Sequence, residues 1–306
     1  MTRCIFVMAS LMSCIDAMLP GSPQHTRRAL GKWGGLLLLA VLTVGCGSNP
    51  AIVGSPADAK PHPAVLTQVS TLDALMGGVY DGETTLAQLK QYGNLGLGTF
   101  NTLDGEMVVV DGHVYQARAD GKVNEPPDST QTPFAAVTFF QAGKTRPAAT
   151  GLDFARLQQT LDSQLPSKNL FYAFRLEGRF QSIKVRSVPR QSRPYPILPD
   201  VVKKQAVFDL ENVEGVLVGF RSPAFAKGLN APGYHLHFLS KDKQAGGHVL
   251  DFVTDKVEVA TQPIHDFRML LPQDQDFYTA TLPFDPSGDM ARQVETKPLA
   301  SPAGKN

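Results

Sequence analysis

Apolar and polar positions alternate in short segments along the chain after residue 65, which is the pattern of β-strands that bury one face. The clearest pair of such segments, MVVV and HVYQAR, is joined by Asp111-Gly112. Asp-Gly between two apolar segments is a strong signal for a two-residue hairpin turn, because both turn positions adopt positive φ. The sequence therefore predicts a β-hairpin over residues 107–118, and the apolar segments at residues 95–100 and 133–140 predict further strands.

Two later segments also have the pattern of hairpins. In the first, FYAFRL and RFQSIKVRSV flank Glu177-Gly178. In the second, GYHLHFLS and AGGHVLDF flank the polar segment KDKQ, residues 241–244. A turn at KDKQ would place His237 directly opposite His248 on the neighbouring strand.

Helical spacing of apolar residues is limited to a few segments. TTLAQLKQYG carries Leu86 and Leu89 at helical spacing, with Gly93 as the expected C-cap. DFARLQQTLDSQL predicts a longer helix with an apolar face that runs from Phe154 to Leu161. Many strands with few helices indicate an α+β fold built on antiparallel or mixed sheets.

An apolar segment near the start of the chain predicts an export signal. Arg27, Arg28 and Lys32 precede GGLLLLAVLTVG, and Cys46 follows it. Basic residues, an apolar core of roughly 7–15 residues and a small residue before the cleavage site are the parts of a secretory signal. LTVGC resembles the bacterial lipoprotein signal, in which the cysteine carries lipid. We therefore expect residues 1–46 to direct export to the periplasm or to a membrane anchor on Cys46; an ordinary signal peptide and an uncleaved anchor are the alternatives.

Cysteine placement and charge exclude several functions. All three cysteines (Cys4, Cys14 and Cys46) lie in the leader, so the rest of the chain has no cysteine to form a disulfide, act as a nucleophile or bind zinc. The whole chain has 29 Lys and Arg and 28 Asp and Glu residues. Four of the basic and one of the acidic residues belong to the leader, which leaves 25 and 27, a formal charge of −2. This balance offers no electrostatic basis for binding nucleic acid.

Proline and small residues divide the chain after the leader. GSNPAIVGSPADAKPHPAV has the composition of a flexible tether. Further on, SRPYPILP contains three prolines and interrupts regular structure. The predicted organisation is a leader, a tether, an N-terminal subdomain and a C-terminal subdomain that carries the histidine hairpin and a tail, at residues 1–46, 47–65, 66–200 and 201–306.

Three of the seven histidines gather on the hairpin around KDKQ. His235 and His237 are two residues apart on one strand, so they point to the same face. His248 lies opposite His237, with Cβ atoms about 5 Å apart. Three imidazole nitrogens with a fourth position left open are typical ligands of a catalytic zinc site. The hairpin therefore predicts a metal site, which we expect to hold zinc; several metal folds share this spacing, so it does not determine the reaction.

Several segments together resemble the alpha-acetolactate decarboxylase family. They are G-T-F-x-x-L-D-G-E, which ends at Glu106, V-R-S-V-P-R-Q around Arg186, and Y-H-x-H-F with a third histidine eleven residues after the second. The resemblance extends over about residues 70–296. It implies two similar α+β subdomains, a metal site on a β-hairpin, a homodimer, and conversion of 2-acetolactate, a 2-hydroxy-3-keto acid, to acetoin and carbon dioxide.

The resemblance also implies roles for individual residues. The three histidines of the hairpin match the family's zinc ligands. Glu106 and Arg186 match its active-site glutamate and arginine, and Thr99, in G-T-F, matches a residue close to the site, where we expect it to contact substrate. Glu295, in QVETKP, is the best match to a glutamate near the C-terminus that reaches the metal site.

These residue types suit the decarboxylation of a β-keto acid. The electrons left behind when carbon dioxide departs need an acceptor, and zinc bound by neutral imidazoles keeps its full charge as a Lewis acid. Arg186 can bind the substrate carboxylate through two parallel hydrogen bonds. A carboxyl group fixed on one side can deliver a proton to one face only, and Glu106 and Glu295 are the candidates.

Two other classes of protein stay open on the residues alone. One is a different three-histidine metalloenzyme, such as a cupin-type oxygenase or a zinc hydratase. A cupin usually has a glutamate a few residues after H-x-H, where this chain has FLSKDK, and a hydratase gives no reason for Arg186. The other is a non-catalytic lipoprotein that binds zinc or a small acid. Taken singly, Glu106, Arg186 and Glu295 would each be interpreted as solvated residues, and only the resemblance to the family favours an active-site role for Glu106 and Arg186.

Overall fold

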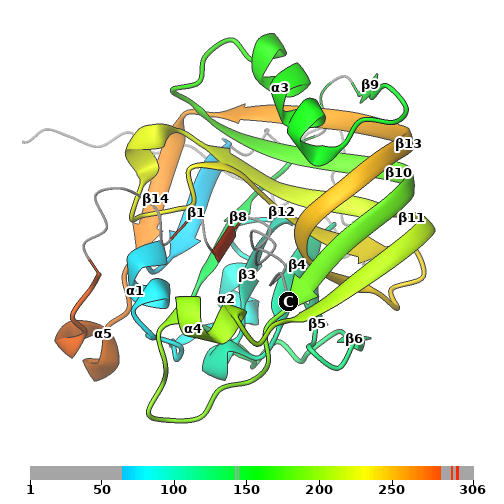
Figure 1. Ribbon diagram of the computed structural model, residues 1–306. Helices are drawn as coiled ribbons and strands as arrows, with labels where there is room; N and C mark the ends of the chain where they lie inside the picture. Colours follow the sequence, from blue (N-terminus) through cyan, green and yellow to red (C-terminus); the bar gives the residue numbers. More distant parts are fainter. Residues whose placement is uncertain (1–63, 142, 144, 284–290, 292–293, 296–306) are drawn as a thin grey trace, which may run out of the picture. The chain divides into compact units, whose positions relative to one another are not determined.

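The computed structural model describes residues 64–141, 143, 145–283, 291, 294 and 295 (Figure 1). The predicted leader with Cys46, and all of the predicted tether up to residue 63, lie outside the described residues. The first strand begins at Val65, the last residue assigned to the tether. The larger strands of the described chain form two groups, an open sheet and a barrel.

The open sheet has seven strands in the order β14-β1-β8-β3-β4-β5-β6. β1 and β14 are parallel, and every other neighbouring pair is antiparallel, so the sheet is mixed. In spatial order the strands are β14 (Asp266–Leu270), β1 (Val65–Val69), β8 (Ala135–Thr138), β3 (Leu95–Thr99), β4 (Glu106–Val110), β5 (His113–Ala117) and β6 (Val123–Asn124). The hairpin predicted around Asp111-Gly112 is confirmed as β4–β5, with φ of 52° and 80° at the two turn residues.

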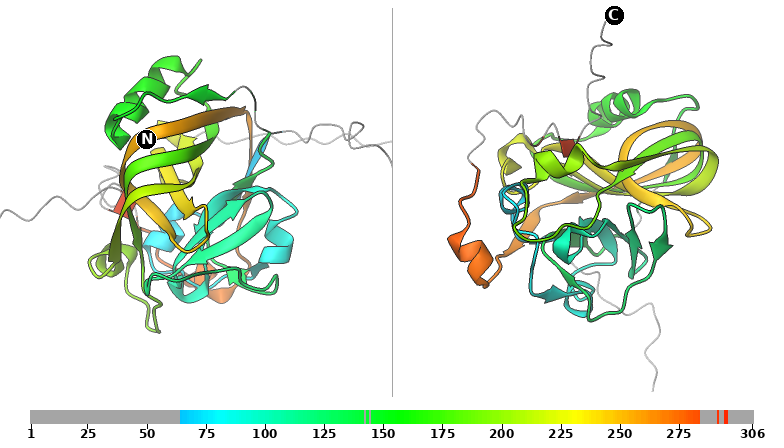
Figure 2. Two further views of the ribbon diagram at one scale, coloured as in Figure 1. Left: turned by 90° about the vertical axis from the view of Figure 1, so that its right-hand side faces the viewer. Right: turned by 60° about the horizontal axis from the view of Figure 1, so that its bottom comes forward.

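Four antiparallel strands close on themselves to form the barrel. They pair in the order β10-β11-β12-β13, and β13 also pairs with β10. The right-hand view of Figure 2 shows the ring that they make. Their bounds are β10 (Phe171–Ser187), β11 (Ala206–Ser222), β12 (Gly233–Ser240) and β13 (Gly246–Ile264), and the short strand β9 (Arg146–Pro147) pairs with β13.

Short helices fill the connections, and β2 (Thr84–Thr85) pairs with β7 (Gln131–Thr132) in a small separate sheet. No helix in the described ranges is both long and apolar enough to span a membrane. The helices are α1 (Leu72–Met76), α2 (Leu86–Leu89), α3 (Phe154–Gln164), α4 (Leu198–Val202) and α5 (Gln275–Thr279), with 3-10 turns η2 (Asn101–Leu103) and η3 (Ala224–Ala226). The α+β class with mixed and antiparallel sheets is confirmed.

Core packing explains why β4 is apolar on both faces. Val108 and Val110 belong to the cluster between the open sheet and the barrel, together with Val218 of β11. Met107 and Val109 point to the opposite face, where the leucines of α2 join their cluster. A strand that is buried on both faces has no reason to alternate with polar residues. Both sides of β4 are therefore held firmly, and this strand begins at Glu106.

The hairpin predicted around Glu177-Gly178 is wrong, because β10 runs through both residues without a turn. Gly178 pairs with Gly215 on one side and Val257 on the other, in the middle of the barrel. A Cβ added at this glycine would lie 2.0 Å from the carbonyl oxygen of Lys256. The glycine therefore permits close approach of a neighbouring strand in a tightly curved barrel, and does not mark a turn.

Of the two predicted helices, one is confirmed and the other is shorter than predicted. α3 is confirmed: the Asp153 carboxylate accepts a hydrogen bond from the backbone N–H of Arg156 at its start, and Leu157 and Leu161 are buried. α2 is much shorter than predicted and is capped at Lys90. Gly93 is not its cap; a Cβ there would lie 2.5 Å from the backbone nitrogen of the adjacent β8 residue Thr138. Close packing against a strand again explains the glycine.

The open sheet and the barrel do not separate at residue 200. β10 precedes that residue yet belongs to the barrel with β11, β12 and β13. β14 lies near the end of the chain yet returns to the open sheet beside β1, as Figure 1 shows. The predicted subdomains, residues 66–200 and 201–306, therefore do not coincide with the two groups of strands, because pairing between distant segments decides the division and no local composition marks it.

Candidate active site and metal centre

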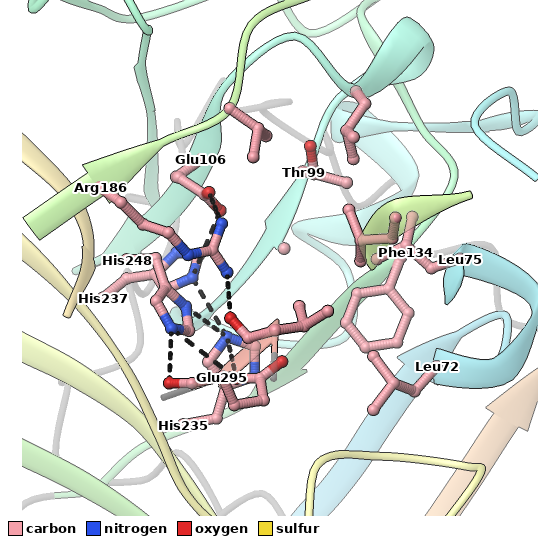
Figure 3. Close-up of a pocket in the computed structure, with 15 residues that line it drawn as sticks. Leu72, Leu75, Thr99, Glu106, Phe134, Arg186, His235, His237, His248 and Glu295 are labelled. Carbon is pink, nitrogen blue, oxygen red and sulfur yellow. Dashed lines mark hydrogen bonds and ion pairs between the residues drawn. The ribbon is translucent and has the colours of Figure 1, made fainter. Parts of the chain in front are cut away.

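The predicted register of the histidine hairpin is confirmed. His237 on β12 pairs with His248 on β13, and the backbone N–H of Ser240 donates to the carbonyl of Ala245 across the turn. His235 lies two residues before His237 and points to the same face. All three imidazoles are buried, and one nitrogen from each lies within 4.8 Å of the others. The hairpin therefore brings three potential metal ligands to one point (Figure 3).

Hydrogen bonds to backbone carbonyls orient two of these rings. His237 Nδ1 lies 2.7 Å from the Met107 carbonyl oxygen, and His248 Nε2 lies 3.2 Å from the Glu295 carbonyl oxygen. Because a carbonyl accepts only, those nitrogens carry the protons. The opposite nitrogens, His237 Nε2 and His248 Nδ1, each lie 3.2 Å from His235 Nε2. Two nitrogens with lone pairs, on His237 and His248, therefore face His235 Nε2.

Burial keeps the three rings neutral. It lowers the pKa of His235 to about 3, and the positive charge of Arg186 acts in the same direction. Burial also lowers the pKa of His237 and His248 well below the usual value for histidine. Neutral imidazole is the form that binds a metal. The converging, unprotonated nitrogens thus fit a metal ion, with His235, His237 and His248 as its protein ligands.

Arg186 and Glu106 form a buried ion pair beside the histidines. Arg186 is on β10 of the barrel and Glu106 is on β4 of the open sheet, so the two groups of strands meet here. Arg186 Nη1 donates to Glu106 Oε1 at 2.8 Å, and both side chains are almost fully buried. The second carboxylate oxygen of Glu106 lies 3.6 Å from His237 Nε2. Arg186 Nη2 also donates to the Val294 carbonyl at 3.2 Å.

Glu295 approaches the histidines from the C-terminal part of the chain. Its Oε2 lies 3.5 Å from His235 Nε2 and 3.8 Å from His248 Nε2. This oxygen is buried and accepts no hydrogen bond from the described residues. Burial raises the pKa of Glu295 to about 7 against the lowering effect of Arg186. Burial likewise raises the pKa of Glu106 to about 7, although Arg186 lowers it.

Thr99 lines the same pocket, but its hydroxyl is already engaged. The hydroxyl donates to the Gly105 carbonyl at 2.7 Å, and Thr99 is paired with Glu106 between β3 and β4. The structure therefore brings together all seven residues that the sequence analysis selected. A substrate contact by Thr99 stays a prediction.

Apolar side chains form the remainder of the pocket, and sequence reasoning did not identify them. In the view of Figure 3, Leu72, Leu75 and Phe134 lie across the pocket from the charged groups. The cavity itself is small, with a volume of about 30 Å³. Its other apolar lining residues are Leu103, Val188, Leu198 and Val294. These residues come from separate elements, and nothing in the sequence distinguishes them from other core residues. The sequence also contains no signal for the backbone carbonyls that orient the histidines.

Comparison with known proteins points to one family. The family model described as alpha-acetolactate decarboxylase matches residues 66–283, a range that includes every selected residue except Glu295. A Methanosarcina mazei alpha-acetolactate decarboxylase is 49% identical over 71% of this chain and 76% of its own length. The corresponding figures for the Brevibacillus brevis protein are 44%, 75% and 79%.

A solved structure extends the likeness to the fold. The crystal structure of alpha-acetolactate decarboxylase from Bacillus subtilis strain 168 matches with a TM-score of 0.74 and 36% sequence identity. The match covers 76% of this chain and 100% of that one. With the family match over most of the chain and the shared fold, this chain belongs to the alpha-acetolactate decarboxylase family.

Proposed function

We propose that this protein converts 2-acetolactate to acetoin and carbon dioxide in a metal-dependent reaction. The observation that carries the proposal is the convergence of three neutral imidazoles, one guanidinium and two carboxyl groups in one pocket with an apolar wall. The names of the related proteins support the same reaction. Neither a cupin-type oxygenase nor a hydratase accounts for both the guanidinium and the carboxyl groups.

We propose zinc as the metal, held by His235, His237 and His248. Three nitrogen ligands without a thiolate suit a catalytic zinc with an open position. When bound, the ion would supply a Lewis acid that stabilises the electrons left after carbon dioxide departs. Neutral ligands preserve its full charge for that purpose.

Arg186 is the group proposed to bind the substrate carboxylate. Its Nε is buried and has no partner among the described residues, so the guanidinium retains an unused donor. Glu106 holds the opposite part of the same guanidinium at Nη1 and fixes its orientation. A fixed, planar donor group can orient the carboxylate so that the bond to be broken is aligned with the electron acceptor. Loss of carbon dioxide then leaves a carbon that needs one proton.

Glu295 is proposed to deliver that proton. Its Oε2 is buried, lies 3.5 Å from His235 Nε2, and is not committed to a hydrogen bond with the described residues. Glu106 is also in the pocket, but its Oε1 is tied to Arg186. Solvent restores the proton to the carboxylate after each turnover.

The first test is acetoin formation from racemic 2-acetolactate by the purified protein. We expect acetoin and carbon dioxide in equal amounts, loss of activity on chelation, and recovery when zinc is added back. Folded, zinc-loaded protein that forms no acetoin would overturn the proposed reaction and favour a binding protein.

Replacement of Glu295 by glutamine tests which of the two carboxyl groups, Glu295 or Glu106, donates the proton. The amide keeps the shape but has no acidic proton, so we expect kcat to fall about 100-fold and the enantiomeric excess of the acetoin to drop. Glu106→Gln, measured in parallel, should retain enantiomeric excess. If instead only Glu106→Gln lowers the enantiomeric excess, the donor is Glu106.

A homodimer is the proposed assembly. Phe225 is 69% exposed and Leu271 is 54% exposed, which is unusual for such large apolar side chains. Phe225 contacts Phe171, which stacks on Phe267 of the edge strand β14, so these three aromatic rings are in contact with one another in series. Sedimentation equilibrium should give twice the mass of the chain; a monomer at micromolar concentration would contradict the proposal.

Export is proposed on the sequence alone. Residues 1–46 and the lipid attachment at Cys46 lie outside the described part of the chain. Cell fractionation of the unaltered protein and of Cys46→Ser tests both. Membrane association that is lost in the variant supports the lipid anchor, and a cytoplasmic protein would contradict export.

A further inference from the structure

The turn that precedes Glu106 has an unusual backbone. Thr102 and Leu103, at the end of the 3-10 turn η2, have φ of 64° and 55°. Residues other than glycine rarely adopt this left-handed backbone conformation, and two such residues in succession are rarer still. Gly105 follows with φ of 86°, and a Cβ there would lie 2.5 Å from the Ala117 carbonyl oxygen. Such a backbone persists only where its surroundings hold it.

Hydrogen bonds from three directions hold this turn. The backbone N–H of Thr102 donates to the Tyr80 carbonyl at 2.7 Å, and the N–H of Gln191 donates to the Thr102 carbonyl at 2.7 Å. The Thr99 hydroxyl donates to the Gly105 carbonyl. These bonds satisfy the carbonyls of Thr102 and Gly105 and leave the carbonyl of Asp104, between them, to be satisfied by other groups.

One side chain satisfies the Asp104 carbonyl. Gln116 Nε2, on β5, donates to it at 2.6 Å. The Gln116 side-chain oxygen in turn accepts from Asn124 Nδ2 at 3.2 Å. Gln116 is only 7% exposed, whereas Asp104 is partly exposed. A carbonyl that loses its protein donor must find another partner, and the turn would shift to reach one.

The turn leads directly to two contacts of the active site. Glu106 begins β4 and binds Arg186, and the carbonyl of the next residue, Met107, orients His237. Gln116 pairs with Met107 across β4 and β5. The same residue therefore braces the turn through its side chain and the strand through its backbone.

We propose that Gln116 is a positioning residue for the reaction, which holds the strained turn at residues 102–105 and thereby sets Glu106 and the Arg186 guanidinium in the geometry needed to align the substrate. This inference rests on the proposed function. Gln116 does not line the pocket, so it would act on the reaction only through the turn. Its effect should appear in the orientation of bound substrate, and hence in kcat, more than in substrate affinity.

The test uses Gln116→Met, which preserves side-chain volume and removes the donor, with Asn124→Ala as the matched control. Asn124→Ala removes the bond to the Gln116 oxygen and leaves the bond to Asp104 in place. For Gln116→Met we expect kcat to fall about 10-fold, with KM within about 2-fold and unchanged zinc content. Amide hydrogen exchange in residues 101–107 should accelerate in this variant and stay near the wild-type rate in the control.

The two measurements distinguish the outcomes. Faster exchange with a reduced kcat supports the proposal, whereas faster exchange with unchanged kcat, or no change in either, overturns it. If Gln116→Met does not fold, Gln116→Glu serves instead, because its ionised carboxylate keeps the shape and donates no hydrogen bond. If the wild-type protein forms no acetoin, the proposed reaction fails, and hydrogen exchange still decides whether Gln116 holds the turn.

Discussion

Replacing His237 with alanine is expected to abolish both metal binding and decarboxylation. His237 is 1% exposed, its Nδ1 is bound to the Met107 carbonyl, and its Nε2 faces the other two histidines. Two remaining ligands do not retain a catalytic metal, and without a Lewis acid the electrons left by carbon dioxide have no acceptor. We expect kcat to fall at least about 1,000-fold. Zinc per chain, measured by mass spectrometry, should fall from one to near zero.

His113→Ala is the matched control for this variant. His113 is an exposed histidine on the β4–β5 hairpin and bonds only to Glu125 among the described residues. Its removal should leave zinc content and activity unchanged. Zinc retained in folded His237→Ala protein would contradict the assignment of the metal ligands, whereas loss of zinc with retained activity would show that the reaction does not need the metal.

Replacing Arg186 with lysine should impair catalysis while the positive charge stays in the pocket. Lysine lacks the planar fork that can bind Glu106 and a substrate carboxylate at the same time. The loss should appear in kcat/KM, with a fall of about 100-fold, equivalent to about 2.7 kcal/mol of transition-state stabilisation. Steady-state kinetics with zinc-saturated protein provides the measurement.

Arg221→Lys controls for the change of a buried arginine. Arg221 is also almost fully buried, lies on the neighbouring strand β11, and bonds to Asp162 outside the active site. Both variants should lose thermal stability by similar amounts, but Arg221→Lys should keep its kcat/KM. Equal activity losses in the two variants would mean that Arg186 acts through packing and has no direct role with substrate.

The sequence does not distinguish the role of Arg186 from that of Arg221. Each lies on a strand, and nothing in the sequence predicts that either side chain is buried. Only the resemblance to a family distinguished Arg186. In the structure, the barrel strand β10 brings Arg186 against Glu106 of the open sheet, 80 positions away in the chain. Arg221 meets Asp162 of α3 in the same way and has no part in the pocket.

The structural role of a glycine is equally hard to predict from the sequence. Asp111-Gly112 was interpreted correctly as a turn, because the backbone requirement is local. Gly178 and Gly93 were interpreted as a turn and a helix cap, but both allow another strand to approach closely. Sequence reveals that a glycine is present, and the reason for it depends on which distant segment lies beside it.

The features that could be derived from the sequence are local ones. The two-residue period of a strand and the length of the KDKQ turn placed His235, His237 and His248 on one face in the correct register, and helical spacing of apolar residues identified α3. Tertiary structure alone decided that β10 joins a closed barrel, that Glu295 returns to the histidines, and that α1 supplies an apolar wall. The physical reason is that turns and strand periods depend on neighbouring residues, whereas burial, pKa shifts and site assembly depend on contacts between segments that the chain order does not specify.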